Sequence, residues 1–257
     1  MSEHVLVERE EGLLTLRLNR LDKKNALTRA MYSSMTEVLQ QADADPSVRA
    51  LLITGGDACF TSGNDVADFL QAPPTSQDSP VFQFMRTLFE FSKPVVAAVS
   101  GPAVGIGTTL LLHCDLVYVS RDAVLKMPFV SLGLCPEFGS SLILPRLLGQ
   151  AKAAELLLLG ESFRGEQAVA WGIANQALAN GAETLAKARE MALRFQQLAP
   201  SAVADSKRLL RAPGREELRR VIEEEGVLFG QRLRSPEAIE ALSAFMQRRP
   251  ADFSKFA

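Results

Sequence analysis

Apolar and polar residues alternate near the N-terminus and then change to helical spacing. The stretch HVLVEREEGLLTLRLN predicts two strands joined at Glu11–Gly12, a hairpin by alternation and turn chemistry. After Thr28, an N-cap residue type, apolar residues recur every three or four positions as far as Ala42, which predicts a helix. Three later runs are continuously apolar: Arg49–Gly56, Pro94–Gly101 and Asp115–Ser120. Such runs are typical of a mostly parallel sheet that helices cover on both faces.

Beyond about Gln150 the strand pattern stops and helical composition takes over. We predict helices in four places: Ala151–Gly160, near Glu183–Gln197, Arg215–Gln231 and Pro236–Gln247. The polar, proline-rich stretch Gln71–Pro80 predicts a mobile loop. The chain therefore reads as an α/β core over residues 1–195, followed by a helical C-terminal region over residues 196–257.

Composition narrows the class of protein without naming a function. The 257 residues are 47% hydrophobic and 23% charged, which is ordinary for a globular enzyme or binding domain. A net charge of -2 gives no reason to expect a nucleic-acid or membrane-surface partner. The apolar stretches are interrupted by Pro and Gly, and the N-terminus is neither a signal nor a transit peptide. The three cysteines form no CxxC pair, which fits a reducing compartment, so we expect a cytoplasmic location.

Two glycine turns follow buried strands, in CFTSGNDVADF and in SGPAVGIGTTLLLHCD. In the second turn, Gly105 and Gly107 would expose backbone N–H groups at a helix N-terminus, where partial positive charge favours an anion. If the turns converge, the N–H groups of Asn64 and Ile106 would hold one oxygen from two sides, as an oxyanion hole does. The alternative is that these glycines only make tight turns and allow close packing.

Four motifs in order resemble the crotonase, or enoyl-CoA hydratase/isomerase, superfamily: LNRLDKKNAL, FTSGNDV, KPVVAAVSGPAVGIG and HCDLVYVSRDAVLKMPFVSLGL. The resemblance covers roughly residues 5 to 180. It implies a spiral core of ββα repeats, a helical C-terminal trimerisation region, and a homotrimer or dimer of trimers. It also implies an acyl-CoA thioester as substrate, whose oxygen would take the N–H groups of Asn64 and Ile106. Coenzyme A enters as part of that substrate, and no separate cofactor is implied.

The resemblance further implies substrate-binding residues around these donors: Lys24, Ser62, Gly63, Asp65, Gly105, Phe129 and Leu132. Lys23 and Lys24 would meet the coenzyme phosphates, as that loop does in similar proteins, and a solvated charge pair is the alternative. For Asp65 a structural role, capping its own turn, also stands. With two histidines and no carboxylate cluster at metal-ligand spacing, we expect no metal site.

The choice of reaction depends on which acids are present. Hydratases that the chain resembles use two glutamates to activate water, and the matching positions here hold Thr109 and Phe129. One acid remains nearby, Glu137 in LGLCPEFGSS. This arrangement resembles the 3-enoyl-CoA to 2-enoyl-CoA isomerases of the peroxisomal type, which use a single glutamate, although Phe138 stands where that motif often has Gly. An apolar pocket would raise the pKa of Glu137 toward the working range of a base. An exposed turn glutamate is the alternative.

These residues predict an isomerase of fatty-acid oxidation that moves the double bond of a 3-enoyl-CoA to the conjugated 2-position. Glu137 would take a proton from C2 and return it to C4, while the oxyanion hole holds the dienolate. The alternatives are enoyl-CoA hydration, another reaction of the superfamily such as dienoyl isomerisation or thioester hydrolysis, and a non-catalytic acyl-CoA binder. Acyl chain length and pathway stay open, because pocket depth depends on how side chains are arranged.

The C-terminal helices carry apolar residues that need a surface to cover: Leu209, Leu210, Leu218, Val221, Ile222, Val227, Leu228 and Phe229. Burying such stripes around a threefold axis leaves no exposed apolar patch. We therefore expect a trimer or a hexamer, with the helical layer lying over the active site or over a neighbouring subunit.

Overall fold

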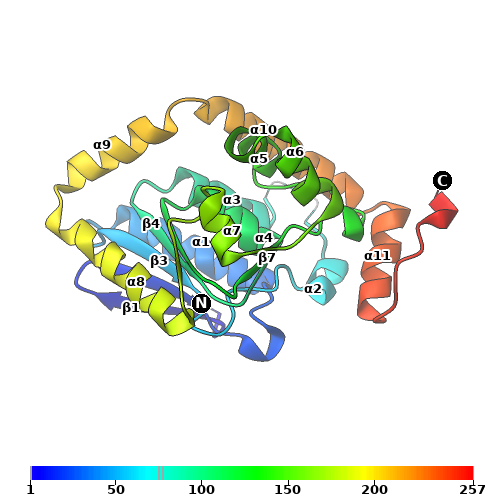
Figure 1. Cartoon of the computed structure of the whole chain (residues 1–257), viewed down its shortest axis with the longest axis horizontal. Coiled ribbons are helices and arrows are strands. Elements are labelled where there is room, and N and C mark those ends of the chain that lie inside the picture. Colours follow the sequence, from blue (N-terminus) through cyan, green and yellow to red (C-terminus); the bar gives the residue numbers. More distant parts are fainter. Residues whose placement is uncertain (1, 75, 77, 257) are drawn as a thin grey trace.

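The computed structural model describes residues 2–74, 76 and 78–256 and is built around a six-stranded sheet (Figure 1). The strands lie in the order β1 (Val5–Glu10), β2 (Leu13–Leu18), β3 (Ala50–Thr54), β4 (Val95–Val99), β6 (Leu116–Ser120) and β9 (Gln176–Leu178). The first pair is antiparallel, and each later neighbour is parallel. Glu11 and Gly12 both take positive φ in the turn of the predicted hairpin. The hairpin and the three apolar strands are confirmed.

A second, smaller sheet carries one of the glycine turns. It consists of β5 (Pro102–Val104), β7 (Val124–Lys126) and β8 (Phe163–Arg164). The prediction that strands stop near Gln150 is wrong, because β8 and β9 lie beyond it. These strands have two and three residues, too few to show an alternating pattern, and only their pairing with β7 and β6 defines them.

Helices occupy most of the rest of the described chain. They are α1 (Arg29–Ala44), α2 (Val66–Gln71), α3 (Pro80–Glu90), α4 (Ile106–Thr109), α5 (Ser140–Leu148), α6 (Gln150–Ala154), α7 (Gly165–Ala170), α8 (Gly181–Leu193), α9 (Pro200–Arg211), α10 (Arg215–Arg232) and α11 (Pro236–Met246). Short 3-10 segments are η1 (Leu21–Lys23), η2 (Leu110–His113), η3 (Val130–Leu132), η5 (Arg194–Gln197) and η6 (Ser254–Phe256), and η4 (Glu155–Leu159) is a π-helical turn. The Thr28 hydroxyl accepts a hydrogen bond from Met31 N–H at 3.3 Å, so the predicted N-cap is confirmed.

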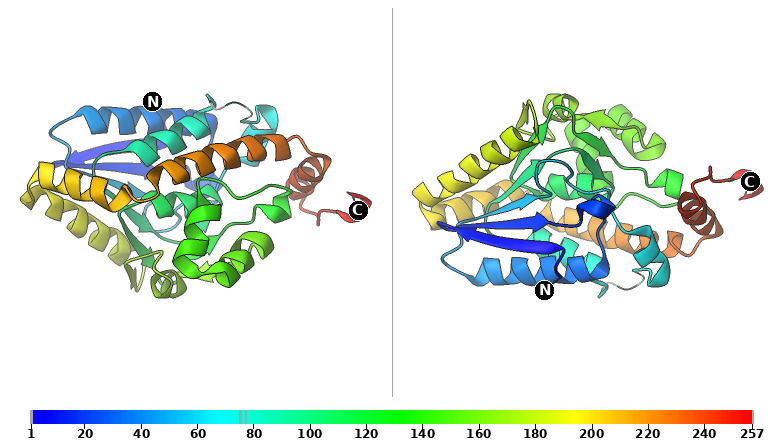
Figure 2. Two further views of the ribbon diagram at one scale, coloured as in Figure 1. Left: turned by 90° about the horizontal axis from the view of Figure 1, so that it is seen from above. Right: turned by 90° about the horizontal axis from the view of Figure 1, so that it is seen from below.

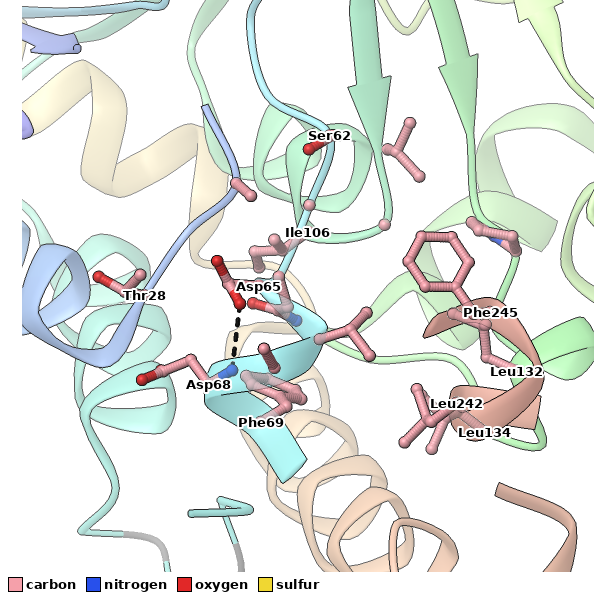
Figure 3. A pocket seen from close by; sticks show the side chains of 18 of the residues that line it. Thr28, Ser62, Asp65, Asp68, Phe69, Ile106, Leu132, Leu134, Leu242 and Phe245 are labelled. Carbon is pink, nitrogen blue, oxygen red and sulfur yellow. Dashed lines mark hydrogen bonds between the residues drawn. The ribbon is translucent and has the colours of Figure 1, made fainter. Parts of the chain in front are cut away.

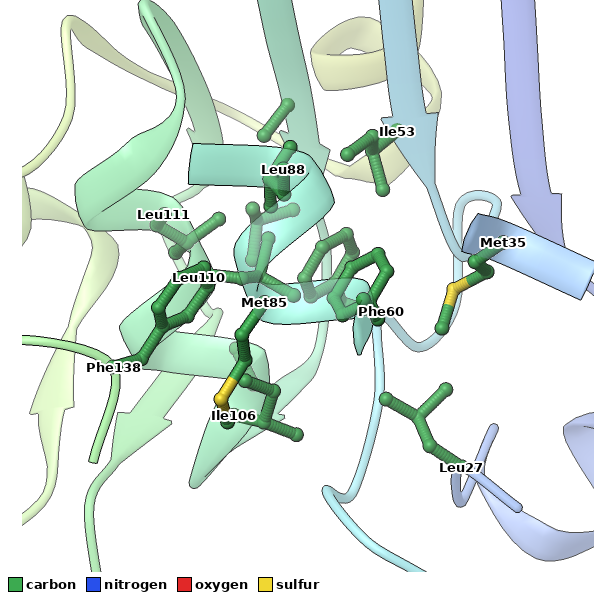
Figure 4. Packing of buried hydrophobic residues seen from close by; sticks show 14 of the residues in the cluster. Leu27, Met35, Ile53, Phe60, Met85, Leu88, Ile106, Leu110, Leu111 and Phe138 are labelled. Atoms are coloured by element: carbon green, nitrogen blue, oxygen red, sulfur yellow. The ribbon is translucent and has the colours of Figure 1, made fainter. Parts of the chain in front are cut away.

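Helices cover both faces of the large sheet, as the continuously apolar strands predict. On one face α8 packs against β3, β4 and β6, around Ala98 and Ala188. On the other face, side chains from α1, α3 and the α4–η2 segment gather around Phe60 (Figure 4). Alternate residues of one strand therefore enter two separate cores: Leu51 and Ile53 belong to the larger core, while Leu52 belongs to the α8 core.

The C-terminal helices lie on the chain's own core. Between α8 and α9 the chain turns back, and α9 and α10 then run across the molecule toward α11 at the opposite end (Figures 1 and 2). Helix α10 packs on α5, and α11 packs on α2 and η3. The predicted boundary between residues 195 and 196 falls within η5. The predicted Gln71–Pro80 loop begins at the end of α2 and ends at the start of α3, and its residues 75 and 77 lie outside the described part of the chain.

Candidate active site

The two glycine turns converge, which the sequence could state only as a condition. Thr61 N–H donates to Pro102 C=O at 2.9 Å, and Val104 N–H donates back to Thr61 C=O at 3.1 Å. Gly63, with φ of +91°, lies so close to Val104 that a Cβ there would stand 2.8 Å from the Val104 carbonyl oxygen. Glycine at position 63 therefore serves both the backbone conformation and the close approach of the turns.

At this junction the backbone N–H groups of Asn64 and Ile106 have no acceptor among the described residues. Ile106 is the first residue of α4, so its N–H precedes the first intrahelical hydrogen bond. Around Asn64 the chain pairs with Leu27 only through its neighbours, since Leu27 N–H donates to Gly63 C=O and Asp65 N–H donates to Leu27 C=O. Both free donors belong to residues that line one cavity.

That cavity has a volume of about 870 Å³, within the range of small-molecule sites. It is lined by eight residues chosen from the sequence: Ser62, Gly63, Asn64, Asp65, Gly105, Ile106, Phe129 and Leu132. Figure 3 shows Leu132, Leu134 and Phe245 facing the wall that carries Ile106 and Asp65. The structure thus brings the predicted donor and wall residues together, and their roles stay predictions.

The C-terminal helices complete the cavity with residues that the sequence interpretation did not identify as cavity residues. Phe229 of α10 and Leu242, Phe245 and Met246 of α11 line it. These residues follow ordinary helical spacing, so nothing in the sequence separates a pocket wall from a packing stripe. In the single chain, this helical layer lies over the chain's own site.

Lys24 is not among the residues that line the cavity, whereas its neighbour Lys23 is. Lys24 ends the η1 turn with φ of +50°, and its carbonyl accepts a hydrogen bond from Ser62 N–H at 2.9 Å. The left-handed conformation of Lys24 sets the backbone direction of the loop, in which Lys23 is the lysine that lines the cavity. Arg20 and Lys126 also line the cavity; Lys126 adds positive charge to it, whereas the charge of Arg20 is paired with Asp65.

Asp65 has a clear structural role as well as a place on the wall. Its carboxylate accepts a hydrogen bond from Asp68 N–H at 3.1 Å and so caps α2. It also pairs with Arg20 at 2.6 Å. Burial alone would raise the pKa of Asp65, but the hydrogen bonds from Arg20 and Asp68 bring it below its ordinary value. The capping role considered from the sequence is confirmed.

Glu137 is buried, with 2% of its surface exposed, so the alternative of an exposed turn glutamate is wrong. Burial is the main cause that raises the pKa of Glu137 to about 8, and the negative charge of Glu225 adds to it. The Thr109 hydroxyl donates to Glu137 Oε1 at 3.4 Å and acts in the opposite direction. Glu137 does not itself line the cavity. Thr109 joins it to Gly105, which does, because the Thr109 backbone N–H donates to Gly105 C=O at 3.0 Å.

The turn after Glu137 is held by an aromatic stack. Phe138 has φ of +56°, a conformation that costs a non-glycine residue about 1–2 kcal/mol. Its ring stacks on His113 with centroids 3.7 Å apart, and His113 Nε2 lies 2.7 Å from the Phe138 carbonyl oxygen. Burial lowers the pKa of His113 to about 3, so the ring is neutral and donates through Nε2–H. His113 is a core residue whose Nε2–H has a hydrogen-bond acceptor. Its stacking on Phe138 helps to hold a non-glycine residue at a position where the motif that the sequence resembles often has Gly.

Two further residues near the site were missed by the sequence analysis. The hydroxyl of buried Tyr32 donates to Asn64 Oδ1 at 2.5 Å. Glu225 of α10 is also buried and bonds to the turn after Glu137. A signal for Glu225 exists in the sequence, since it follows Leu218 and Ile222 and precedes Phe229 at the spacing of one helical face. A glutamate on an otherwise apolar helical face, such as Glu225, predicts a buried carboxylate that hydrogen-bonds to a polar partner.

Residues 2–74, 76 and 78–256 can also be described for metal-ligand clusters, thiols and membrane-spanning helices. No group of three or more His, Cys, Asp or Glu side chains in this part of the chain is arranged to hold a metal ion. Its cysteines are free thiols, and burial raises the pKa of Cys135 to about 11, which keeps it protonated near neutral pH. No helix of the described residues is both long and apolar enough to cross a membrane.

Comparison with protein families adds the decisive observation to this geometry. The family described as enoyl-CoA hydratase/isomerase matches residues 8–255. The chain belongs to the enoyl-CoA hydratase/isomerase family. Its fold is accordingly the crotonase fold, with a helical C-terminal region, and the superfamily inferred from four motifs is confirmed.

Members of this family with high similarity differ in the reactions that their names state. The chain is 36% identical over 256 residues to enoyl-CoA delta isomerase 2 of Rattus norvegicus, covering 97% of this chain and 65% of that protein. It is 32% identical to 2,3-dehydroadipyl-CoA hydratase of Escherichia coli, covering 98% and 99%. Among solved structures, Pseudomonas aeruginosa OdaA shows 72% identity and a TM-score of 0.95, covering 96% of this chain and all of that one.

Proposed function

We propose that this protein is an isomerase of fatty-acid oxidation that converts 3-enoyl-CoA thioesters to 2-enoyl-CoA thioesters. The observation that carries the proposal is the environment of Glu137. It is a buried carboxyl group whose pKa is raised to about 8, and Thr109 joins it to the turn that precedes the free Ile106 N–H. A base that titrates near the working pH is suited both to remove and to return a proton.

The proposed reaction needs one carboxylate and two donors. The thioester oxygen accepts hydrogen bonds from the N–H groups of Asn64 and Ile106, and the ionised Glu137 removes a proton from C2. The electron pair left at C2 delocalises over the C3–C4 double bond as a dienolate, whose oxygen the two donors stabilise. Glu137 then delivers the same proton to C4, and the double bond is left between C2 and C3. Each donor is worth about 2.7–4 kcal/mol in such sites.

Hydration is the second candidate, because the relatives include a hydratase. Against it stand the side chains at the two positions where the resemblance places the acids of hydratases. Thr109 is buried and its hydroxyl is engaged with Glu137, while Phe129 is an aromatic residue on the cavity wall. Neither side chain can take a proton from water, and the isomerase reaction consumes none.

The substrate class follows from the charge and shape of the cavity. Lys23 and Lys126 supply positive charge suited to the phosphates of coenzyme A, and the apolar wall from α10 and α11 suits an acyl chain. Of the two lysines that the sequence interpretation offered for these phosphates, Lys23 lines the cavity and Lys24 does not. Binding of the coenzyme would supply energy remote from the reacting carbons.

A pair of assays tests the proposal. With 3-hexenoyl-CoA we expect the absorbance of a conjugated enoyl thioester to rise in proportion to enzyme. With 2-hexenoyl-CoA as the starting material, loss of that absorbance would report hydration. Faster turnover in the second assay than in the first would identify a hydratase. Saturable binding without turnover in either would identify a non-catalytic acyl-CoA binder.

A further inference from the structure

Glu225 reaches from α10 to the start of α5 and bonds through both carboxylate oxygens. Oε2 accepts from Gly139 N–H at 2.5 Å, and Oε1 accepts from the N–H and the hydroxyl of Ser141 at 3.0 and 2.5 Å. Helix α5 has no side-chain N-cap of its own, because Gly139 occupies that position. Glu225 therefore satisfies N–H groups that the helix would otherwise leave free, and it places negative charge at the positive end of the helix dipole.

The backbone that Glu225 holds is the backbone that carries Glu137. Glu137 C=O accepts hydrogen bonds from Ser140 N–H at 3.1 Å and from the Ser140 hydroxyl at 2.6 Å. Between Glu137 and Ser140, both Phe138 and Gly139 take positive φ, so the chain turns sharply. A Cβ at Gly139 would collide with Leu218 of α10, which shows how closely that helix lies against the turn.

The same face of α10 also forms part of the cavity. Phe229 lies one helical turn beyond Glu225 and lines the cavity. Helix α10 therefore supports the turn of Glu137 and one wall of the site as a single rigid element.

We propose that Glu225 is a positioning residue for Glu137: it holds the turn that carries Glu137 and brings a second carboxyl group to that turn. The catalytic consequence rests on the proposed function, in which Glu137 transfers the proton. The placement itself rests on the bonds from Gly139 and Ser141.

The acidic neighbour of Glu137 is Glu225, whose own pKa is raised by burial while its hydrogen bonds from Ser141 and Gly139 oppose that rise. The other titratable groups around Glu137 are neutral or paired elsewhere. They come from α1, from η2, from the preceding loop and from α10: Tyr32, His113, Cys135 and Arg232. Burial keeps the first three neutral between about pH 4 and 9, because it raises the pKa of Tyr32 and Cys135 and lowers that of His113. Arg232 pairs with Glu237 at 2.5 Å and donates to Gly133 C=O at 3.0 Å. A like charge disfavours ionisation of Glu137.

The test replaces Glu225 by Gln and compares it with Glu223→Gln, which neutralises an exposed glutamate two residues earlier on the same helix. Gln keeps the shape but loses the charge, and its NH2 group cannot accept the bonds from the turn. We expect kcat to fall about tenfold or more with KM near the parent value, because the base is misplaced. We also expect the acidic limb of kcat/KM against pH to move to lower pH. The Glu223→Gln protein should match the parent in both.

A second variant, Ser141→Ala, tests the support of the Glu137 turn separately from the charge of Glu225. It removes one donor to Glu225 and keeps the carboxylate, so we expect a lower kcat with an acidic limb close to that of the parent. If folded Glu225→Gln retains the parent kcat, or loses kcat without a move of the limb, the proposal is overturned. Should Glu225→Gln fail to fold, an unchanged kcat in Ser141→Ala would overturn it instead.

Titration of the unliganded protein makes the test independent of the reaction. Infrared difference spectra against pH report the Glu137 carboxyl band, which Glu137→Gln identifies by removing it. We expect Glu225→Gln to lower the pKa of that band. If this shift is seen but the parent protein fails to isomerise 3-hexenoyl-CoA, the proposed function fails and the placement of Glu225 stands. An active enzyme without the shift overturns the role of Glu225 alone.

Discussion

Thr109 donates a hydrogen bond to Glu137 Oε1 at 3.4 Å, and both side chains are buried. The resemblance to hydratases places a water-activating acid at position 109. This chain has Thr109 there instead, and its hydroxyl group is a partner of the single proposed base, Glu137. The hydroxyl group stabilises the ionised form of Glu137, while burial and Glu225 disfavour it. The balance of these effects sets the pH at which the base becomes active.

Glu137→Gln should lower isomerase turnover by about 10²–10⁴-fold, because Gln keeps the size and polarity but cannot carry the proton. Binding of the thioester should stay close to that of the parent. Steady-state rates with 3-hexenoyl-CoA and calorimetric binding of the same ligand measure the two quantities. An equivalent change at exposed Glu161 serves as the control and should leave both unchanged. Near-parent turnover in Glu137→Gln would exclude this residue as the base.

Activity should rise with pH through about 8. The pKa of Glu137 is raised from 4.5 to about 8, and the base must be ionised to accept the C2 proton, so kcat/KM should be lost as the pH falls below that value. Thr109→Val removes the hydrogen bond that lowers this pKa, so the acidic limb should move to higher pH. A pH–rate profile of each protein checks both statements. A limb near pH 4.5 in the parent, or a downward move in the variant, would contradict them.

Glu137 should also make stability depend on pH. Between pH 4.5 and about 8 the folded state holds a proton on Glu137 and the unfolded state does not, so the free energy of unfolding should fall as pH rises across this window. Glu137→Gln removes this loss and should be more stable than the parent at pH 9, by a few kcal/mol at most. At pH 5 the difference should be small. Urea unfolding at both pH values measures it, and equal differences at the two would argue against the assigned pKa.

Ile106 should act through its backbone rather than its side chain. Ile106→Val trims a fully buried residue and should cost about 0.5–1.5 kcal/mol of stability with most activity kept. Ile106→Pro removes the N–H, although proline is acceptable at the first position of a helix, which Ile106 occupies in α4. We expect a proline variant that binds the coenzyme portion but does not turn over. Isomerase activity in a folded proline variant would remove this N–H from the site.

The protein should form a trimer or a hexamer in solution. Part of the apolar stripe predicted to need cover packs on the chain's own core, namely Leu218, Ile222 and Phe229. Val221 is half-buried, and four others stay open in the single chain: Leu209 is 62%, Leu210 83%, Val227 55% and Leu228 47% exposed. Such apolar surface favours burial against other copies. A mass near 28.0 kDa by light scattering at micromolar concentration would contradict the prediction.

The fold could be predicted where the pattern is long. The hairpin, the buried strands and the long helices each bury a regular set of side chains over five residues or more, and that regularity is visible in the chain. Strands β8 and β9 could not be predicted, because two or three residues carry no period and form only when a partner strand lies beside them. The helical run predicted over Ala151–Gly160 divides into α6 and a π-helical turn for which the spacing gives no signal.

The sequence by itself determined the family, the two glycine turns and the single acid in the right neighbourhood, since each depends on residue types at fixed separations. Only the tertiary structure decided that Gly63 meets Val104, that Lys23 rather than Lys24 lines the cavity, and that the chain's own C-terminal helices close it. The physical reason is distance along the chain. Glu225 contacts Gly139 across 86 residues, and a contact of that kind exists only once the packing of α10 has brought the two together.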